Sequence, residues 1–170
     1  HVEPGKIYGF LGPNGAGKST TMNMMTGYIA PTQGSVKING YDLIKDAEKA
    51  KSCIGYLPEI PPLYGEMTVK EYLSFVAELK RIPKRERADQ LRQVMEMVMI
   101  QDMADRLIKN LSKGYKQRVG LAQAILGYPE VIILDEPTVG LDPKQIIEIR
   151  DLIKKLGEKH TVILSSHILS

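Results

Sequence analysis

The chain has 170 residues, of which 43% are hydrophobic and 25% charged, a composition typical of one soluble globular domain. Its net charge is only +3, so we expect no nucleic-acid partner, and the basic stretch at residues 78–92 is interpreted as a solvated helix face. No apolar run approaches the roughly 18 residues that a transmembrane helix requires. The single cysteine, Cys53, excludes an internal disulfide and fits a cytosolic, buried and inert thiol.

A glycine-rich motif lies near the start of the chain. It fits the phosphate-binding pattern G-x-x-x-x-G-K-[ST] at every fixed position, and its residues are Gly12, Pro13, Asn14, Gly15, Ala16, Gly17, Lys18, Ser19 and Thr20. The glycines give the backbone conformations closed to other residues, so amide N–H groups can surround phosphate oxygens. We expect Lys18 to reach the β- and γ-phosphates of a nucleotide and the Ser19 hydroxyl to ligate Mg²⁺. A strand at 6–11 and a helix at 19–28 should flank the loop.

The next segment mixes short strands with helices. A strand at 35–39 precedes Asn39-Gly40, a strong hairpin signal, and another strand covers 54–58. From Thr68 the pattern becomes helical, and Glu71 is the capping-box partner of Thr68. Helical spacing predicts two buried faces, which comprise Val69, Tyr72, Leu73, Val76 and Leu79, and then Leu91, Val94, Met95, Val98 and Met99.

The last third of the chain returns to an α/β pattern. A helix follows Ser112, and a second helix at 145–157 should bury Ile146, Ile149, Leu152, Ile153 and Leu156. The apolar runs at 131–134 and 161–164 are typical of buried parallel strands. The chain is therefore predicted to be an α/β core that is interrupted by a helical insertion.

Two carboxylates, Asp135 and Glu136, follow the strand at 131–134. Because ligands of such sheets lie beyond the carboxyl ends of the strands, Asp135 should hold Mg²⁺ and Glu136 should polarise a water that attacks the γ-phosphate. Ser112 should cap a helix whose N-terminus offers an anion site. His167 follows the strand at 161–164 and can reach toward the γ-phosphate if that strand neighbours the Asp135 strand.

The order of these motifs resembles the ATP-binding subunit of ABC transporters, and most closely the group that serves ABC-2 type exporters. The resemblance rests on the phosphate loop, on Asp135-Glu136 and on three further segments: Leu111-Ser112-Lys113-Gly114, Gly140-Leu141-Asp142 and Ser166-His167. It implies a RecA-like P-loop NTPase fold with a parallel sheet at 1–66 and 116–170, a helical subdomain at 67–115, and a truncated antiparallel β part.

The resemblance also implies an activity and partners. The chain would bind ATP and Mg²⁺, hydrolyse ATP and power transport through a separate transmembrane permease subunit, on the inner face of the cell membrane. A second ATP-binding subunit, identical or different, would pair head to tail. Ser112, Gly114 and Asp142 would then act across the dimer, while Lys18, Glu136 and His167 would form the catalytic set.

Three features depart from the family pattern. Lys113 and Tyr115 replace a glycine and a glutamine of the usual signature Leu-Ser-Gly-Gly-Gln, while Ser112 and Gly114 are kept. Glu59 stands where the family has a Mg²⁺-sensing glutamine, and we expect it to meet the metal. Both ends of the chain indicate a trimmed domain, because no residue precedes the loop at the family's adenine-stacking position.

Other P-loop classes fit less well. An ATPase of DNA repair needs a long coiled coil before the signature, and the stretch between Lys18 and Leu111 is too short for one. A translation-associated ABC protein would carry two such domains. A regulatory module that binds ATP without hydrolysing it would lack Glu136. A GTPase would carry an N-K-x-D motif, which the sequence does not contain.

Overall fold

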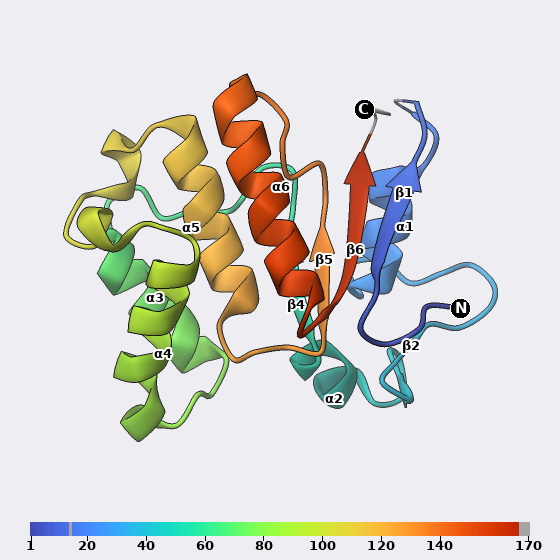
Figure 1. Cartoon of the computed structure of the whole chain (residues 1–170). Helices are drawn as coiled ribbons and strands as arrows, with labels where there is room; N and C mark the ends of the chain where they lie inside the picture. The colour runs from blue at the N-terminus through green and yellow to red at the C-terminus, as the bar shows by residue number, and fades with distance from the viewer. Residues whose placement is uncertain (14, 167–170) are drawn as a thin grey trace. The chain divides into compact units, whose positions relative to one another are not determined.

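The structure, a computed structural model, describes residues 1–13 and 15–166 (Figure 1). The chain divides into two compact units. The core unit comprises the described parts of residues 1–59, 129–137 and 153–170, and the helical unit comprises residues 60–128 and 138–152. The domain bounds that we placed at residues 67 and 115 stay a prediction. No helix in the described residues is both long and apolar enough to cross a membrane.

A parallel sheet forms the centre of the core unit. Its strands in the described residues are β1 (Ile7–Leu11), β4 (Ile54–Leu57), β5 (Val131–Leu134) and β6 (Thr161–Ser166), in the spatial order β1-β6-β5-β4 (Figure 1). The register pairs Gly9 with Leu164, and Leu134 with both Leu164 and Leu57. The carboxyl ends of all these strands therefore meet at one edge of the sheet, which is where the candidate site residues follow.

Apolar side chains between the sheet and helix α1 (Lys18–Met25) hold the phosphate loop in place. Met22 of α1 packs against Ile133 of β5 and Ile163 of β6, and all three are buried. Full burial of such a side chain contributes about 1.5–3 kcal/mol. The helix is shorter than the predicted 19–28, because Gly27 has a left-handed φ of 76° that ends it.

A small antiparallel hairpin precedes β4. Strands β2 (Lys37–Ile38) and β3 (Tyr41–Asp42) are joined by Asn39 and Gly40, whose φ angles of 49° and 83° fit a type I′ turn, as predicted. Helix α2 (Ala47–Ser52), which the sequence analysis missed, follows and packs on the hairpin. Cys53 at its end is buried, and this burial raises the pKa of the thiol.

Helices make up the helical unit. They are α3 (Val69–Leu79), α4 (Lys84–Met97), the 3₁₀ turns η1 (Gln101–Met103) and η2 (Ile108–Asn110), α5 (Lys113–Ile125), and the residues up to 152 of α6 (Pro143–Gly157). Thr68 and Glu71 form the predicted capping box at the start of α3. The predicted faces are buried or, at Met95, partly buried, except at two positions where the prediction was wrong: Leu79 is 65% exposed and Met99 is 51% exposed. Both lie at or beyond a helix end, and Met99 has a left-handed φ of 56°.

Two cations, the partly buried Lys80 and the buried Arg118, connect the helices of this unit. The Lys80 ammonium donates to the backbone carbonyls of Gln123, Ala124 and Leu126 at 2.6, 3.2 and 2.7 Å, and so caps the end of α5. Burial lowers the pKa of Lys80 to about 8. Arg118 of α5 donates to the Val98 carbonyl at 3.0 Å and pairs with Glu148 of α6. These contacts fix α5 against its neighbouring helices.

Candidate functional site

The phosphate loop leaves β1 and enters α1. Gly15 and Gly17 have left-handed φ angles of 80° and 87°, and a Cβ at either position would meet no atom within 4 Å. Glycine is therefore required there by the backbone conformation and not by space. Gly12 differs from our expectation, because its φ is not left-handed and a Cβ there would make ordinary contact with Ala16 at 3.4 Å. Asn14 lies outside the described residues.

The first turn of α1 faces this loop. Among the described residues, no side chain caps the helix at Gly17, and its first turn contains no acidic residue. The N–H groups of that turn carry the positive end of the helix dipole, which favours an anion. Ser19 and Thr20 in the turn are exposed, so their hydroxyls are open to a ligand. The Ala16 N–H donates to the Pro13 carbonyl at 3.2 Å and keeps the loop tightly curved.

Lys18 connects the loop to the carboxylates after β5. Its side chain is 7% exposed, and its ammonium donates to the carbonyls of Gly12 at 2.7 Å and Pro13 at 3.1 Å. The same ammonium lies 3.7 Å from Oε1 of Glu136, which is also buried. Two residues more than 100 positions apart in sequence, both predicted as catalytic, are thus brought together in the core unit.

Asp135 and Glu136 are held by the neighbouring strand β6. Asp135 extends the sheet, because its N–H donates to the Leu57 carbonyl at 2.8 Å. Ser165, which is fully buried, donates from its hydroxyl to Oδ1 of Asp135 at 2.6 Å and accepts the Glu136 N–H at 2.9 Å. The sequence analysis gave Ser165 no role. Its role follows only from the register of the sheet, in which the pairing of Leu134 with Leu164 places Ser165 beside Asp135.

Tyr56 of β4 lies near these acids. Burial, together with the negative charge of Asp135, raises the pKa of Tyr56 to about 12. Its hydroxyl donates to Oδ1 of Asn23 on α1 at 3.5 Å. Tyr56 therefore stays protonated and neutral near pH 7, and Glu136 is the better candidate for a general base.

Glu59 is exposed and lies in the bend that follows β4. No interaction among the described residues joins it to Asp135, Ser19 or Lys18. Among the described residues, no group of three histidine, cysteine, aspartate or glutamate side chains could hold a metal ion by itself. A Mg²⁺ ion would therefore need ligand oxygens in addition to Ser19 and Asp135, which is the usual way that proteins bind Mg²⁺ with nucleotides.

The signature segment begins helix α5 in the helical unit. Ser112 caps this helix, as predicted, and accepts the Tyr115 N–H at 3.3 Å. Gly114 is buried, and a Cβ there would lie only 2.5 Å from Nε2 of Gln145. At this position glycine makes room for another side chain of the same unit.

Asp142 immediately precedes α6, which begins at Pro143, two residues earlier than we expected for that helix. Its carboxylate accepts the Gln145 N–H at 2.9 Å, and its own N–H donates to Oε1 of Gln145 at 3.4 Å. The sequence Asp-Pro-x-Gln, with Pro143 at the first helical position, is a signal for this reciprocal cap, which we did not predict. His167, our remaining catalytic candidate, lies outside the described residues.

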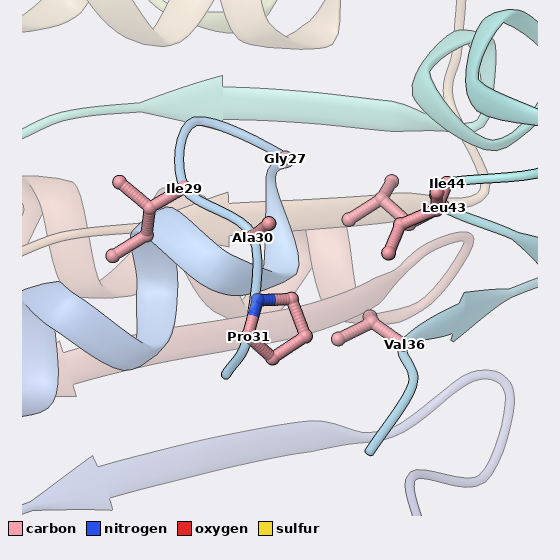
Figure 2. A pocket seen from close by; sticks show the side chains of 7 residues that line it. All are labelled: Gly27, Ile29, Ala30, Pro31, Val36, Leu43 and Ile44. Atoms are coloured by element: carbon pink, nitrogen blue, oxygen red, sulfur yellow. The ribbon is translucent and has the colours of Figure 1, made fainter. Parts of the chain in front are cut away.

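A separate hollow of about 80 Å³, lined by apolar side chains, lies in the core unit (Figure 2). Its lining residues carry no charge, and they are Gly27, Ile29, Ala30, Pro31, Val36, Leu43 and Ile44. Such a lining offers phosphate no cation, so this hollow does not compete with the loop around Lys18 as a nucleotide site.

Comparisons with known proteins agree with the geometry. Residues 1–139 match the family model described as ABC transporter. The chain is 44% identical over 172 residues to the bacitracin transport ATP-binding protein BcrA of Bacillus licheniformis, covering all of this chain and 55% of that protein. It is 37% identical to the linearmycin resistance ATP-binding protein LnrL of Bacillus subtilis, covering 99% of this chain and 54% of that protein.

Solved structures give the same result for the fold. A structure of an ATP-binding subunit of an ABC transporter aligns with a TM-score of 0.85 at 34% identity, over 99% of this chain and 70% of that one. The cassette MJ0796, solved as a dimer bound to ADP and Pi, aligns with a TM-score of 0.87 at 28% identity, over 99% and 78%. The chain spans about half the length of the curated relatives. The predicted α/β P-loop fold is confirmed, and the chain belongs to the ABC transporter family, as an ATP-binding cassette.

Proposed function

We propose that this chain binds ATP together with Mg²⁺, hydrolyses ATP, and thereby powers transport through a separate membrane partner. The convergence of Lys18 and Glu136, 3.7 Å apart and both buried, carries the proposal. A cation from a phosphate loop and a carboxylate from the end of a neighbouring strand are the two groups that phosphoryl transfer requires at one place.

The loop fits a triphosphate. Gly15 and Gly17 leave open space where side chains would stand, and the first turn of α1 adds N–H groups that no side chain caps. Lys18 would exchange its loop carbonyls for phosphate oxygens, which are stronger acceptors because they are charged. The backbone of residues 12–20 would bind and orient the phosphates, and so exclude water from all but the reacting position.

Ser19 and Asp135 would hold Mg²⁺, with Glu59 as a further ligand, direct or through water. Hydroxyl and carboxylate oxygens are the donors that Mg²⁺ prefers. The ion, when bound, neutralises charge on the phosphates and orients them. Glu59 is exposed at the sheet edge where Asp135 also lies, so it has room to turn toward the metal.

Glu136 would accept the proton of the attacking water, and its burial beside Lys18 keeps the carboxylate close to the phosphate loop. His167 would assist at the γ-phosphate. This division gives binding to the loop and chemistry to Glu136, and it predicts that the two can be separated by mutation.

A second ATP-binding subunit and a transmembrane permease are the proposed partners, at the inner face of the cell membrane. Support comes from the relatives, since MJ0796 is a dimeric cassette and BcrA is a transport protein. Ser112, Gly114 and Asp142 would contact ATP bound to the second subunit. Lys113, in place of the usual glycine, adds a cation at that contact.

The direct test is nucleotide binding by Lys18→Met, which keeps the apolar stem and removes the ammonium. Loss of charge-assisted hydrogen bonds worth about 1.5–3 kcal/mol should weaken ATP at least about tenfold in a calorimetric titration. Lys37→Met, at an exposed lysine of the same unit, is the matched control and should bind normally. Unchanged affinity in a folded Lys18→Met protein would refute the proposal.

A further inference from the structure

Ser165 contacts both acids of the proposed site, although it follows from no motif. Its hydroxyl donates to Oδ1 of Asp135 at 2.6 Å and accepts the backbone N–H of Glu136 at 2.9 Å. The side chain is fully buried at the end of β6. We infer that Ser165 is a positioning residue, which sets Asp135 for the metal and Glu136 for the water; this inference rests on the proposed function.

The bond to Asp135 restricts the carboxylate. At 2.6 Å it has the length of a hydrogen bond between a hydroxyl and a charged oxygen. It engages one lone pair of Oδ1 and holds the side chain in one rotamer, so that Oδ2 and the second lone pair of Oδ1 are available to another ligand. Without the hydroxyl, Asp135 would be free to rotate, and the affinity for Mg²⁺ would fall because the ligand would have to be ordered on binding.

The hydrogen bond from the Glu136 N–H to Ser165 stabilises an unfavourable backbone conformation at Glu136. Glu136 has a φ of 48°, a left-handed conformation that residues with a Cβ rarely adopt. Such a conformation persists only where its surroundings impose it, and it is frequent at functional sites. Here the buried N–H of Glu136 finds its acceptor on Ser165, so the turn that directs the Glu136 side chain toward Lys18 depends on the same hydroxyl.

A purely structural role makes a different prediction. If Ser165 only satisfied buried groups between β5 and β6, its replacement would lower stability without changing the metal dependence of binding or the turnover rate. A positioning role predicts that ATP binding without metal is kept, while the gain in affinity from Mg²⁺ and the rate of hydrolysis both fall. The two roles are therefore separable in solution.

The test compares Ser165→Ala and Ser165→Cys with the wild type in the full chain. Titrations of a fluorescent ATP analogue, with Mg²⁺ and with EDTA, give the gain in affinity, and steady-state assays give kcat and its Mg²⁺ dependence. We expect unchanged affinity in EDTA, a gain from Mg²⁺ that is smaller by about tenfold or more, and a kcat lowered at least about tenfold. Ser165→Cys, similar in volume but a weak donor, should be intermediate and also serves if Ser165→Ala does not fold.

Thr26→Val is the matched control, because Thr26 is buried in the same unit and its hydroxyl donates to carbonyls of its own helix. It should change stability alone. A Ser165→Cys protein with wild-type Mg²⁺ dependence and kcat would overturn the inference, as would equal effects in Thr26→Val. A wild-type chain that binds no ATP would instead refute the proposed function.

Discussion

The effect of Gly114→Ala on stability should depend on whether the Gln145 side chain is present. A Cβ at this position would lie 2.5 Å from Nε2, 2.7 Å from Cδ and 2.9 Å from Oε1 of Gln145, so the whole amide must move in Gly114→Ala. These atoms are the far end of a flexible, half-buried side chain, so the amide can turn away at a cost of less than about 1 kcal/mol. The displaced amide also loses the Asp142 N–H, which it accepts at 3.4 Å.

In a protein that lacks the Gln145 side chain, Gly114→Ala should raise stability. Once Gln145→Ala has removed the amide, the Cβ has space, and alanine is favoured over glycine within a helix by up to about 1 kcal/mol. We therefore expect Gly114→Ala to destabilise the wild type by less than about 1 kcal/mol, through the lost hydrogen bond, and to stabilise the Gln145→Ala protein slightly. Urea unfolding of the four proteins measures this coupling.

A matched cycle uses Lys144→Ala, at the exposed neighbour of Gln145, and should show no coupling. The reasoning is refuted if Gly114→Ala costs the same with and without the Gln145 side chain. ATP hydrolysis gives a second readout. If Gly114 also approaches a phosphate in the second subunit, the double variant should recover stability without recovering hydrolysis.

Three further predictions concern other parts of the chain. The Lys80 pKa is lowered from 10.5 to about 8, so Lys80 binds more protons in the unfolded chain between these values. The Lys80 contribution to the free energy of unfolding should therefore rise with pH across that window, by up to about 1.4 kcal/mol per pH unit, and it is measured as the difference in slope between the wild type and Lys80→Met. Glu59→Gln should change the Mg²⁺ concentration needed for half-maximal hydrolysis, and coincident titrations would exclude Glu59 from the metal shell. Thr68→Ala should lower stability by about 1 kcal/mol through loss of the capping box, whereas Thr68→Ser should not, as thermal unfolding would show.

Local signals in the sequence predicted local structure well. The capping box of Thr68 and Glu71 and the hairpin turn at Asn39-Gly40 both depend on neighbours in sequence, and both are confirmed. Periodicity failed at Leu79 and Met99 because it was extended to or past the ends of α3 and α4, where side chains no longer face the core. The short helix α2 was missed because six residues carry too little periodicity.

Single sequence motifs predicted part of the candidate site. The phosphate loop and the two acids were found by pattern, and the parallel pairing of β5 with β6 confirms that the strand before His167 neighbours the Asp135 strand. Ser165 needed the register of that pairing, which a motif does not give. The contact between Gly114 and Gln145 needed the packing of two helices, and the left-handed φ of Glu136 has no signal in its residue type.

Hydrolysis by Glu136→Gln tests the central claim most directly. The change keeps the shape of the side chain and removes the base, while Lys18 and the loop stay intact. Binding of ATP should persist near the wild-type affinity, and the steady-state rate of hydrolysis should fall on the order of 10²-fold or more. A variant that binds ATP and hydrolyses it at close to the wild-type rate would contradict the account and make His167 the next candidate.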